Sequence, residues 1–212
     1  EAALEKQKLA FTHSGIADGY DISGLTDMEN TALYKNGFLA VQSKSAMQAV
    51  MAVGISEGDR LLDCCAAPGG KSAYAAALTN GSADMTAWEL YAHRADMTRS
   101  NFERLGVRAS VEVRDAAVFD ASLCGRFDVV IVDAPCSAMG LMAHSPDVRY
   151  TRRPKDITQL CELQMRILSA CAGYVRKGGK LAYMTCSINR EENENVTDAF
   201  LQQESSFTLK NP

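Results

Sequence analysis

Short apolar runs alternate with longer segments of helical periodicity from about residue 60 to the end of the chain. The runs are rich in Val, Ile and Leu, which is typical of buried strands. Because strand, helix and strand follow one another, the pattern predicts an α/β fold with a parallel sheet and right-handed crossovers. The segment "RKGGK" predicts a turn before the last strand. The predicted strands are 60–64, 83–89, 109–113, 127–133 and 180–185, and the predicted helices are 72–78, 91–105, 157–175 and 191–203.

The first 58 residues follow a different pattern. They contain a charged helical segment, the glycine-punctuated stretch "GIADGYDISG", a predicted short strand at 37–42 and a predicted helix that begins at Ser43. This part of the chain is short for an independent domain. We therefore expect residues 1–58 to form an N-terminal extension that packs on a core of residues 59–212.

Length and hydropathy favour a globular protein with a sizeable core. The chain has 212 residues, of which 47% are hydrophobic, yet no apolar run approaches the roughly 20 residues that cross a membrane. The first residues, "EAALEKQKLA", are charged where a signal peptide would be apolar. We expect a cytoplasmic protein. Since the chain does not begin with Met, we also expect a fragment or a processed chain.

The cysteines and the charge exclude some functions. The seven cysteines are an odd number without a CxxC pair, so neither a secreted disulfide framework nor a structural metal site is expected. A net charge of -4 argues against a uniformly basic nucleic-acid binder, although a local basic patch remains compatible with it. Most of the cysteines are expected to be small buried apolar residues, namely Cys64, Cys124, Cys161 and Cys171.

The segment "LLDCCAAPGGKS" joins the first core strand to a helix through a glycine turn. Its end resembles a P-loop, but a P-loop would need glycine where Cys65 stands. An NTPase is therefore disfavoured. The alternative is a nucleoside-binding turn in a doubly wound fold, in which Asp63 ends the strand, and Gly69 and Gly70 let the backbone approach a ligand.

Acidic residues stand at or just after the ends of four successive predicted strands: Asp63, Glu89, Asp115 and Asp133. A single acidic residue at such a place is more often a helix cap or a solvated turn. The carboxyl ends of parallel strands share one edge of the sheet, however, and that edge is where such folds bind ligands. We expect Glu89 to accept the ribose hydroxyls of a nucleoside cofactor and Asp115 to meet its adenine amino group.

Two cysteines follow the last two core strands. Cys136 lies in "VVIVDAPCSAMG" and Cys186 lies in "LAYMTCSIN". Since these strands should be neighbours, both thiols can face one crevice, where reactive groups are commonly positioned. A basic cluster follows the first of them and suits RNA phosphates, with a plain solvated face as the alternative. Its members are Arg149, Arg152, Arg153 and Lys155.

Three segments in order, "DCCAAPGGKS", "DAPCSAMG" and "TCSINREEN", resemble the motifs of the S-adenosylmethionine-dependent RNA cytosine-C5 methyltransferases, the Sun family. The resemblance covers about residues 37 to 203. It implies a Rossmann-like class I methyltransferase fold with a doubly wound, mostly parallel sheet that lacks its final strands here. It also implies S-adenosyl-L-methionine as cofactor, no metal, and RNA as partner. Ribosomal RNA is the expected substrate, and transfer RNA or a catalytically silent RNA-binding module are the alternatives.

The resemblance also implies roles for individual residues. Cys186 would be the nucleophile that adds to cytosine C6, and Cys136 would assist product release. Asp133 would bind the N3 and amino edge of the base, and Lys71 would order the site and stabilise a thiolate, unless it faces solvent. The residues expected to hold the cofactor are Asp63, Ala66, Ala67, Pro68, Gly69, Gly70, Lys71, Glu89, Arg94, Asp115 and Asp133.

Overall fold

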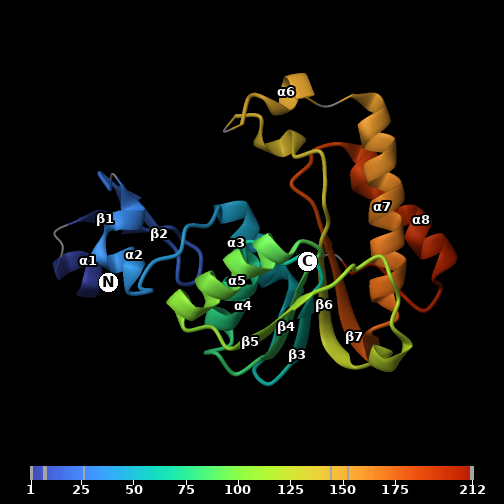
Figure 1. The fold of residues 1–212 in the computed structure, drawn as a ribbon, viewed down its shortest axis with the longest axis horizontal. Helices are drawn as coiled ribbons and strands as arrows, with labels where there is room; N and C mark the ends of the chain where they lie inside the picture. Colours follow the sequence, from blue (N-terminus) through green and yellow to red (C-terminus); the bar gives the residue numbers. More distant parts are fainter. Residues whose placement is uncertain (1, 7–8, 26, 144, 152, 211–212) are drawn as a thin grey trace.

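The computed structural model describes residues 2–6, 9–25, 27–143, 145–151 and 153–210. Its centre is a five-stranded sheet in the order β5-β4-β3-β6-β7, in which all neighbouring strands are parallel (Figure 1). This confirms the predicted doubly wound α/β fold. The strands are β3 Arg60–Asp63, β4 Asp84–Glu89, β5 Ala109–Val113, β6 Phe127–Asp133 and β7 Val175–Met184.

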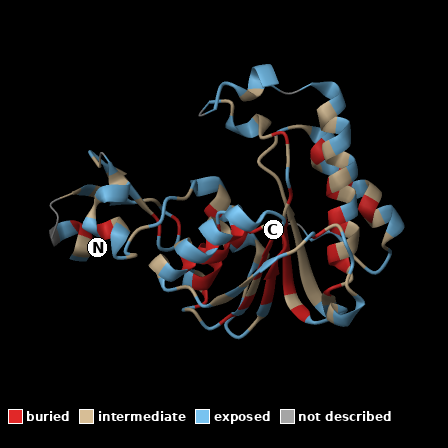
Figure 2. Cartoon of the chain, in the orientation of Figure 1, coloured by how far each residue is buried: buried red, intermediate tan, exposed pale blue. Residues whose placement is uncertain are grey.

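Helices cover both faces of the sheet, because the strands are apolar on both sides. In β3, Leu61 packs with the helices of one face and Leu62 with those of the other. Burial is concentrated in the strands and on the helix surfaces that face them (Figure 2). The helices of the first face are α3 Lys44–Val53, α4 Gly70–Leu78 and α5 Ala92–Leu105, and those of the second are α7 Pro154–Ala172 and α8 Glu194–Gln203.

The chain reverses its direction of travel across the sheet at β3. It first passes outward through β4 to β5, and then returns to the other side of β3 to form β6 and β7. The carboxyl ends of β3 and β6 are therefore adjacent, with loops that leave toward opposite faces. This is the switch point at which doubly wound folds bind their ligands.

Helix α7 and strand β7 both begin before their predicted starts. Helix α7 begins three residues before the predicted start at 157, because Pro154 fits its first turn and Asp156 accepts the backbone N–H of Arg153 at 2.9 Å. The predicted turn at 176–180 lies inside β7. There β7 advances from Val175 to Lys180 while β6 advances two residues, so the turn is an irregularity within one strand.

The N-terminal residues form a small unit beside α4 and α5. It contains helix α1 Ala2–Lys6, the antiparallel hairpin of β1 Ala10–His13 and β2 Tyr20–Ser23, and helix α2 Ala32–Lys35 (Figure 1). The predicted strand at 37–42 is wrong, because this segment has no strand partner. Gly37 has φ +77° and lies so close to α5 that a Cβ would meet the Arg104 carbonyl.

Arg104 of α5 anchors this N-terminal unit. Its guanidinium carbon lies 3.7 Å from the centre of the Tyr34 ring, and its Nη1 donates to the carbonyl oxygens of Tyr34 and Leu39, both at 2.9 Å. On α4, the Tyr74 hydroxyl donates to the Ala17 carbonyl at 2.7 Å. Hydrogen bonds from side chains of α4 and α5 to backbone carbonyls thus hold the extension against the core.

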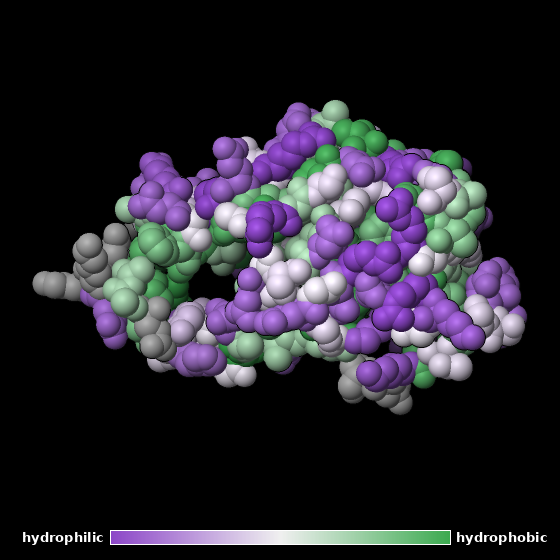
Figure 3. Space-filling view, turned by 90° about the horizontal axis from the view of Figure 1, so that it is seen from below, coloured by the Kyte–Doolittle hydropathy of each residue, from purple (hydrophilic) through white to green (hydrophobic). Residues whose placement is uncertain are grey.

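The opposite edge of the sheet, where the strands begin, is polar. Seen from below, much of the surface is hydrophilic (Figure 3). At the start of β6, Asp128 forms ion pairs with Arg60, at 3.2 Å, and with Arg176, and these contacts lower its pKa to about 2. Within the described residues, no helix is both long enough and apolar enough to span a membrane.

Candidate active site

The turn after β3 contains a fully buried carboxylate, Asp63. Its Oδ2 accepts a hydrogen bond from the Ser72 hydroxyl at 2.5 Å, and its Oδ1 accepts one from the Cys65 backbone N–H at 3.3 Å. Burial raises the pKa of Asp63 to about 6, because loss of water disfavours the charged form more than these hydrogen bonds favour it. This carboxyl group therefore keeps its proton to a higher pH than an exposed aspartate does, but it is mostly ionised at physiological pH.

The two glycines of the turn make room for protein segments. Gly69 has φ +97° and a Cβ there would lie 2.7 Å from the Phe102 ring of α5. A Cβ on Gly70 would lie 2.9 Å from Nε2 of Gln42, which comes from the N-terminal extension. The absence of a Cβ therefore lets Phe102 and Gln42 come close to the turn, and the close approach of a ligand to both glycines stays a prediction.

Glu89 at the end of β4 is buried and joined to the same turn. Its Oε1 accepts the Tyr91 backbone N–H at 3.1 Å, and its Oε2 lies 3.5 Å from Nη1 of Arg94. Arg94 also donates to the Ala67 carbonyl at 3.1 Å. Asp115 is exposed after β5 and accepts the N–H of the residue two positions on. The predicted cofactor residues thus lie along one edge of the sheet.

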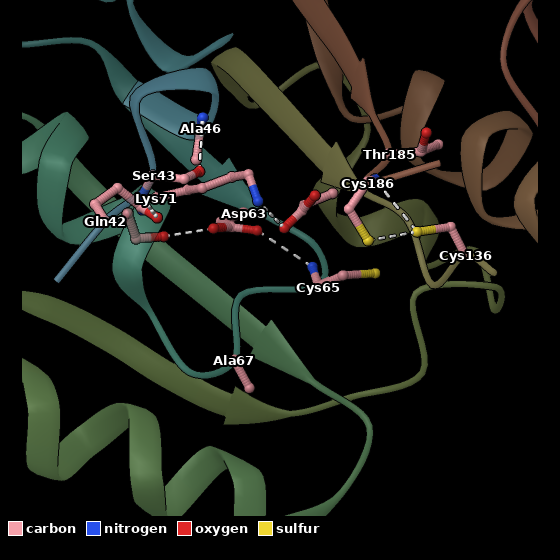
Figure 4. A network of polar contacts seen from close by, with 12 residues as sticks. Gln42, Ser43, Ala46, Asp63, Cys65, Ala67, Lys71, Cys136, Thr185 and Cys186 are labelled. Atoms are coloured by element: carbon pink, nitrogen blue, oxygen red, sulfur yellow. Dashed lines mark hydrogen bonds and ion pairs between the residues drawn. The ribbon is translucent and has the colours of Figure 1, made fainter. Parts of the chain in front are cut away.

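Lys71 and Asp133 form an ion pair between α4 and β6. The Lys71 Nζ lies 2.5 Å from Oδ2 of Asp133, and the two side chains are 22% and 27% exposed. The alternative that Lys71 merely faces solvent does not match this placement. Asp133 belongs to β6 and pairs with Met184 of β7, which places the ion pair at the switch point beside the two cysteine loops (Figure 4).

The two predicted cysteines are brought into contact. The Sγ atoms of Cys136 and Cys186 are 2.9 Å apart, and the Cys186 backbone N–H donates to the Cys136 sulfur at 3.3 Å (Figure 4). Both cysteines are free thiols. They meet because each follows its strand by two or three residues, and β6 and β7 are paired in register at Asp133 and Met184.

The contact shifts the pKa values of the two thiols in opposite directions. Hydrogen bonding from Cys186 lowers the pKa of Cys136 to about 7, helped by the backbone N–H groups of Ala138 and Cys186 and opposed by burial. The pKa of Cys186 is raised, because its proton is held by Cys136 and because burial disfavours its thiolate. Of the two thiols, Cys136 therefore loses its proton first as pH rises, while the proton on Cys186 is retained.

Glu192 is a buried residue beside the two cysteine loops that the sequence interpretation did not single out. Its carboxylate is fully buried and accepts hydrogen bonds from the backbone N–H of Ser137 at 2.8 Å, the Ser137 hydroxyl at 2.5 Å and Nε2 of Gln164 at 3.0 Å. In the sequence, Glu192 is marked only by its position in the motif "TCSINREEN", and this position does not distinguish it from the neighbouring Glu191, which is exposed.

The predicted RNA-binding cluster lies on the segment that leaves the site. Arg149 is in α6 Val148–Thr151, Arg153 precedes α7, and Lys155 is in its first turn. These three side chains are exposed, on a segment that extends away from the sheet (Figure 1). Arg152 lies outside the described residues.

Two of the remaining cysteines differ from expectation. Cys124 is exposed, and Cys161 is partly buried. Cys124 lies in the short connection between η2 Ala121–Leu123 and β6, which runs over the surface. Cys64 and Cys171 are buried in the core, as the composition suggested.

A parallel five-stranded sheet of this order, with carboxyl groups at its switch point, has the Rossmann-like fold of class I S-adenosylmethionine-dependent methyltransferases. A family model described as 16S rRNA methyltransferase RsmB/F matches residues 50–212. The chain belongs to this family. The family and its use of S-adenosylmethionine agree with the resemblance drawn from the three motifs, which is thereby confirmed.

Several relatives support the assignment. The chain is 34% identical over 212 residues to ribosomal RNA small subunit methyltransferase B of Enterobacter sp. (strain 638), covering 99% of this chain and 49% of that protein. It is 36% identical to the Klebsiella pneumoniae protein of the same name, covering 95% and 46%. The chain thus spans about half the length of the curated relatives it matches.

Solved structures show the same fold. NSun6 from Pyrococcus horikoshii, determined with the S-adenosylmethionine analogue SFG, aligns with a TM-score of 0.77 at 26% identity, covering 87% of this chain and 48% of that one. A methyltransferase homologue from the same organism aligns with a TM-score of 0.78 at 28% identity, covering 95% and 64%.

Proposed function

We propose that this chain transfers a methyl group from S-adenosylmethionine to C5 of a cytosine in ribosomal RNA, through a covalent bond between Cys186 and C6 of the base. The observation that carries the proposal is the contact of the Cys136 and Cys186 sulfurs at 2.9 Å, beside the Lys71–Asp133 ion pair. The names of its relatives, which act on the RNA of the small ribosomal subunit, support this class of substrate.

The acidic edge of the sheet fits a cationic nucleoside cofactor. Asp63, Glu89 and Asp133 bring carboxyl groups to the ends of neighbouring strands. Carboxylates accept hydrogen bonds from ribose hydroxyls and attract ammonium and sulfonium groups, whereas the phosphates of ATP would meet like charge. When bound, S-adenosylmethionine supplies an electrophilic methyl group. Glu89 and Arg94 would hold its ribose side, and Asp115 its adenine.

The thiol pair can carry the proton that the reaction must move. As the Cys186 sulfur adds to C6, its proton passes to the Cys136 sulfur across the 2.9 Å contact, with water as the acceptor when Cys136 is absent. Addition moves the C5–C6 electron pair to C5, the atom that gains the methyl group. Loss of the C5 proton to water then reforms the double bond and breaks the C6–S bond. Cys136 returns its proton to the departing Cys186 sulfur, which restores the resting pair.

The base itself would be held by the ion pair. Asp133 accepts from the 4-amino group of cytosine, and Lys71 keeps that carboxylate in place from the α4 side. The target base must leave any stack to reach these groups. Arg149, Arg153 and Lys155 would contact the phosphates of the flanking RNA.

Cysteine variants test the proposal. With in vitro transcribed 16S rRNA and radiolabelled cofactor, Cys186→Ser is expected to abolish methylation and to form no covalent adduct, since a serine hydroxyl is far less ionised than a thiol. Cys136→Ser is expected to lose turnover and to accumulate a protein–RNA adduct that survives denaturing electrophoresis. Cys124→Ser, at an exposed cysteine remote from the crevice, is the control and should resemble wild type.

The opposite pattern would assign the roles differently. An adduct formed by Cys186→Ser and absent from Cys136→Ser would make Cys136 the nucleophile. Full methylation by both variants would exclude covalent catalysis by this pair. Bisulfite sequencing of RNA from cells with and without the gene then locates the modified cytosine, and shows whether it lies in ribosomal or transfer RNA.

A further inference from the structure

Glu192 joins three segments around the thiol pair. It lies in the short helix η4 Arg190–Glu192, with a side chain that is 0% exposed. Its carboxylate accepts from Ser137 twice, through the backbone N–H and the hydroxyl, and from the amide of Gln164 on α7. Ser187 contributes a further side-chain hydrogen bond. A buried carboxylate with this many donors is held in one position.

The two serine donors are the sequence neighbours of the two cysteines. Ser137 follows Cys136, Ser187 follows Cys186, and the two serine Oγ atoms are 3.1 Å apart. Gln164 also donates to the carbonyl of Pro135, the residue before Cys136, at 2.9 Å. The loop of Cys136 is therefore tied to Glu192 on both sides of the thiol, and the loop of Cys186 is tied to it through the serine.

We infer that Glu192 is a positioning residue, which holds the Cys136 and Cys186 loops together so that their sulfurs stay in hydrogen-bond contact. The inference rests on the proposed function for what the thiols do, but the contact itself does not depend on it. Glu192 is suited to this role as an anion. Burial raises its pKa, yet hydrogen bonds from Ser137, Ser187 and Gln164 outweigh burial and leave the pKa lowered.

Two effects of Glu192 on Cys136 have opposite signs. The negative charge of Glu192 by itself raises the pKa of Cys136, whereas the sulfur contact that Glu192 maintains lowers it to about 7. Removing the carboxylate would therefore lower the pKa of Cys136 further if only charge mattered. It would raise the pKa toward the ordinary 9.0 if the contact is lost.

The other charged and titratable groups around the pair remain in such a variant. Lys71 and Asp133 face Cys186 from α4 and β6, and Tyr183 of β7 lies near Cys136. A change in the acidity of Cys136 can therefore be assigned to Glu192.

Alkylation of the full chain measures this acidity. The rate of reaction with isotope-labelled iodoacetamide is followed across a pH series, and mass spectrometry resolves the peptides of Cys136 and Cys186. Glu192→Ala is expected to move the Cys136 inflection from about 7 toward 9.0. Glu192→Gln keeps one acceptor oxygen and should fall between it and wild type. Glu191→Ala removes the exposed neighbouring carboxylate and should leave the inflection unchanged.

An unchanged or lowered Cys136 inflection in Glu192→Ala would overturn the inference. If circular dichroism shows that this variant does not fold, Ser187→Ala decides instead. That substitution removes one serine of the link and should shift the inflection in the same direction, whereas no shift would again overturn the inference. If the variants show these shifts but the wild-type chain methylates no RNA, the proposed function alone is refuted.

Discussion

Replacing Asp63 with Asn should change how stability depends on pH. The pKa of this buried carboxyl is 3.8 when unperturbed and about 6 in the fold. Because the folded-state pKa is raised, the folded chain holds the proton more tightly than the unfolded chain does. The stability contributed by the proton is fully present below pH 3.8 and is lost as pH rises through about 6. At 1.36 kcal/mol per pKa unit, the loss is about 3 kcal/mol.

Urea unfolding across this pH window measures the effect. As pH rises from 3.8 through about 6, the free energy of unfolding of wild type should fall by about 3 kcal/mol more than that of Asp63→Asn. The Asn amide stays neutral over this range and contributes no such loss. Asp128, whose pKa is lowered to about 2, titrates below the window and is present in both proteins. Asp84→Asn, at an exposed aspartate, is the matched control and should follow wild type. Parallel curves for wild type and Asp63→Asn would refute the reasoning.

Three further variants, one of them a double substitution, test the fold and the RNA contact. Gly69→Ala should destabilise the fold by about 1 to 3 kcal/mol more than Gly81→Ala, because both glycines have positive φ but only a Cβ at 69 meets a ring; equal urea midpoints would contradict this. Arg104→Ala should speed proteolysis of the N-terminal extension, through loss of hydrogen bonds worth about 1.5 to 3 kcal/mol; an unaltered cleavage rate would show that the anchor is not needed. Replacing Arg149 and Arg153 with Ala should weaken RNA binding and flatten its salt dependence in filter binding, with affinity for S-adenosylhomocysteine unchanged; an unaltered slope would return them to a solvated face.

The core could be predicted from the sequence because its strands are apolar on both faces. Four of the five strands begin and end within about two residues of the predicted bounds, a usual margin for such boundaries. The segment at 37–42 is apolar in sequence and was mistaken for a strand, but Phe38 and Val41 are exposed, and backbone contacts of Leu39 and Gly37 with Arg104 of α5 fix its path. Such a tertiary contact leaves no periodic signal. The irregularity in β7 was likewise read as a turn, since Gly178 has the positive φ that turns use.

The site was predictable in outline, because strand order decides which loops meet. Because the strands that precede Cys136 and Cys186 were expected to be neighbours, the two cysteines were expected to lie close together, as they do in β6 and β7. Glu192 could not be distinguished from Glu191, because the difference between them is burial and hydrogen bonding, which depend on how α7 and the two cysteine loops come together. The contacts that Gly69 and Gly70 make with Phe102 and Gln42 could not be predicted for the same reason, and their role toward the cofactor stays a prediction.

The irregularity in β7 separates two parts of that strand with different tolerance to change. Between Val175 and Lys180 the strand already contains extra residues relative to β6, so an insertion there can be absorbed without moving the rest of the strand. Between Lys180 and Met184 each residue pairs with β6. One added residue there would turn the side chains of β7 to the opposite faces and carry Cys186 away from Cys136. Insertions and deletions among related chains should therefore occur near Gly178 and Gly179. They should be rare between Lys180 and Met184, where the pairing with β6 sets the position of Cys186 relative to Cys136.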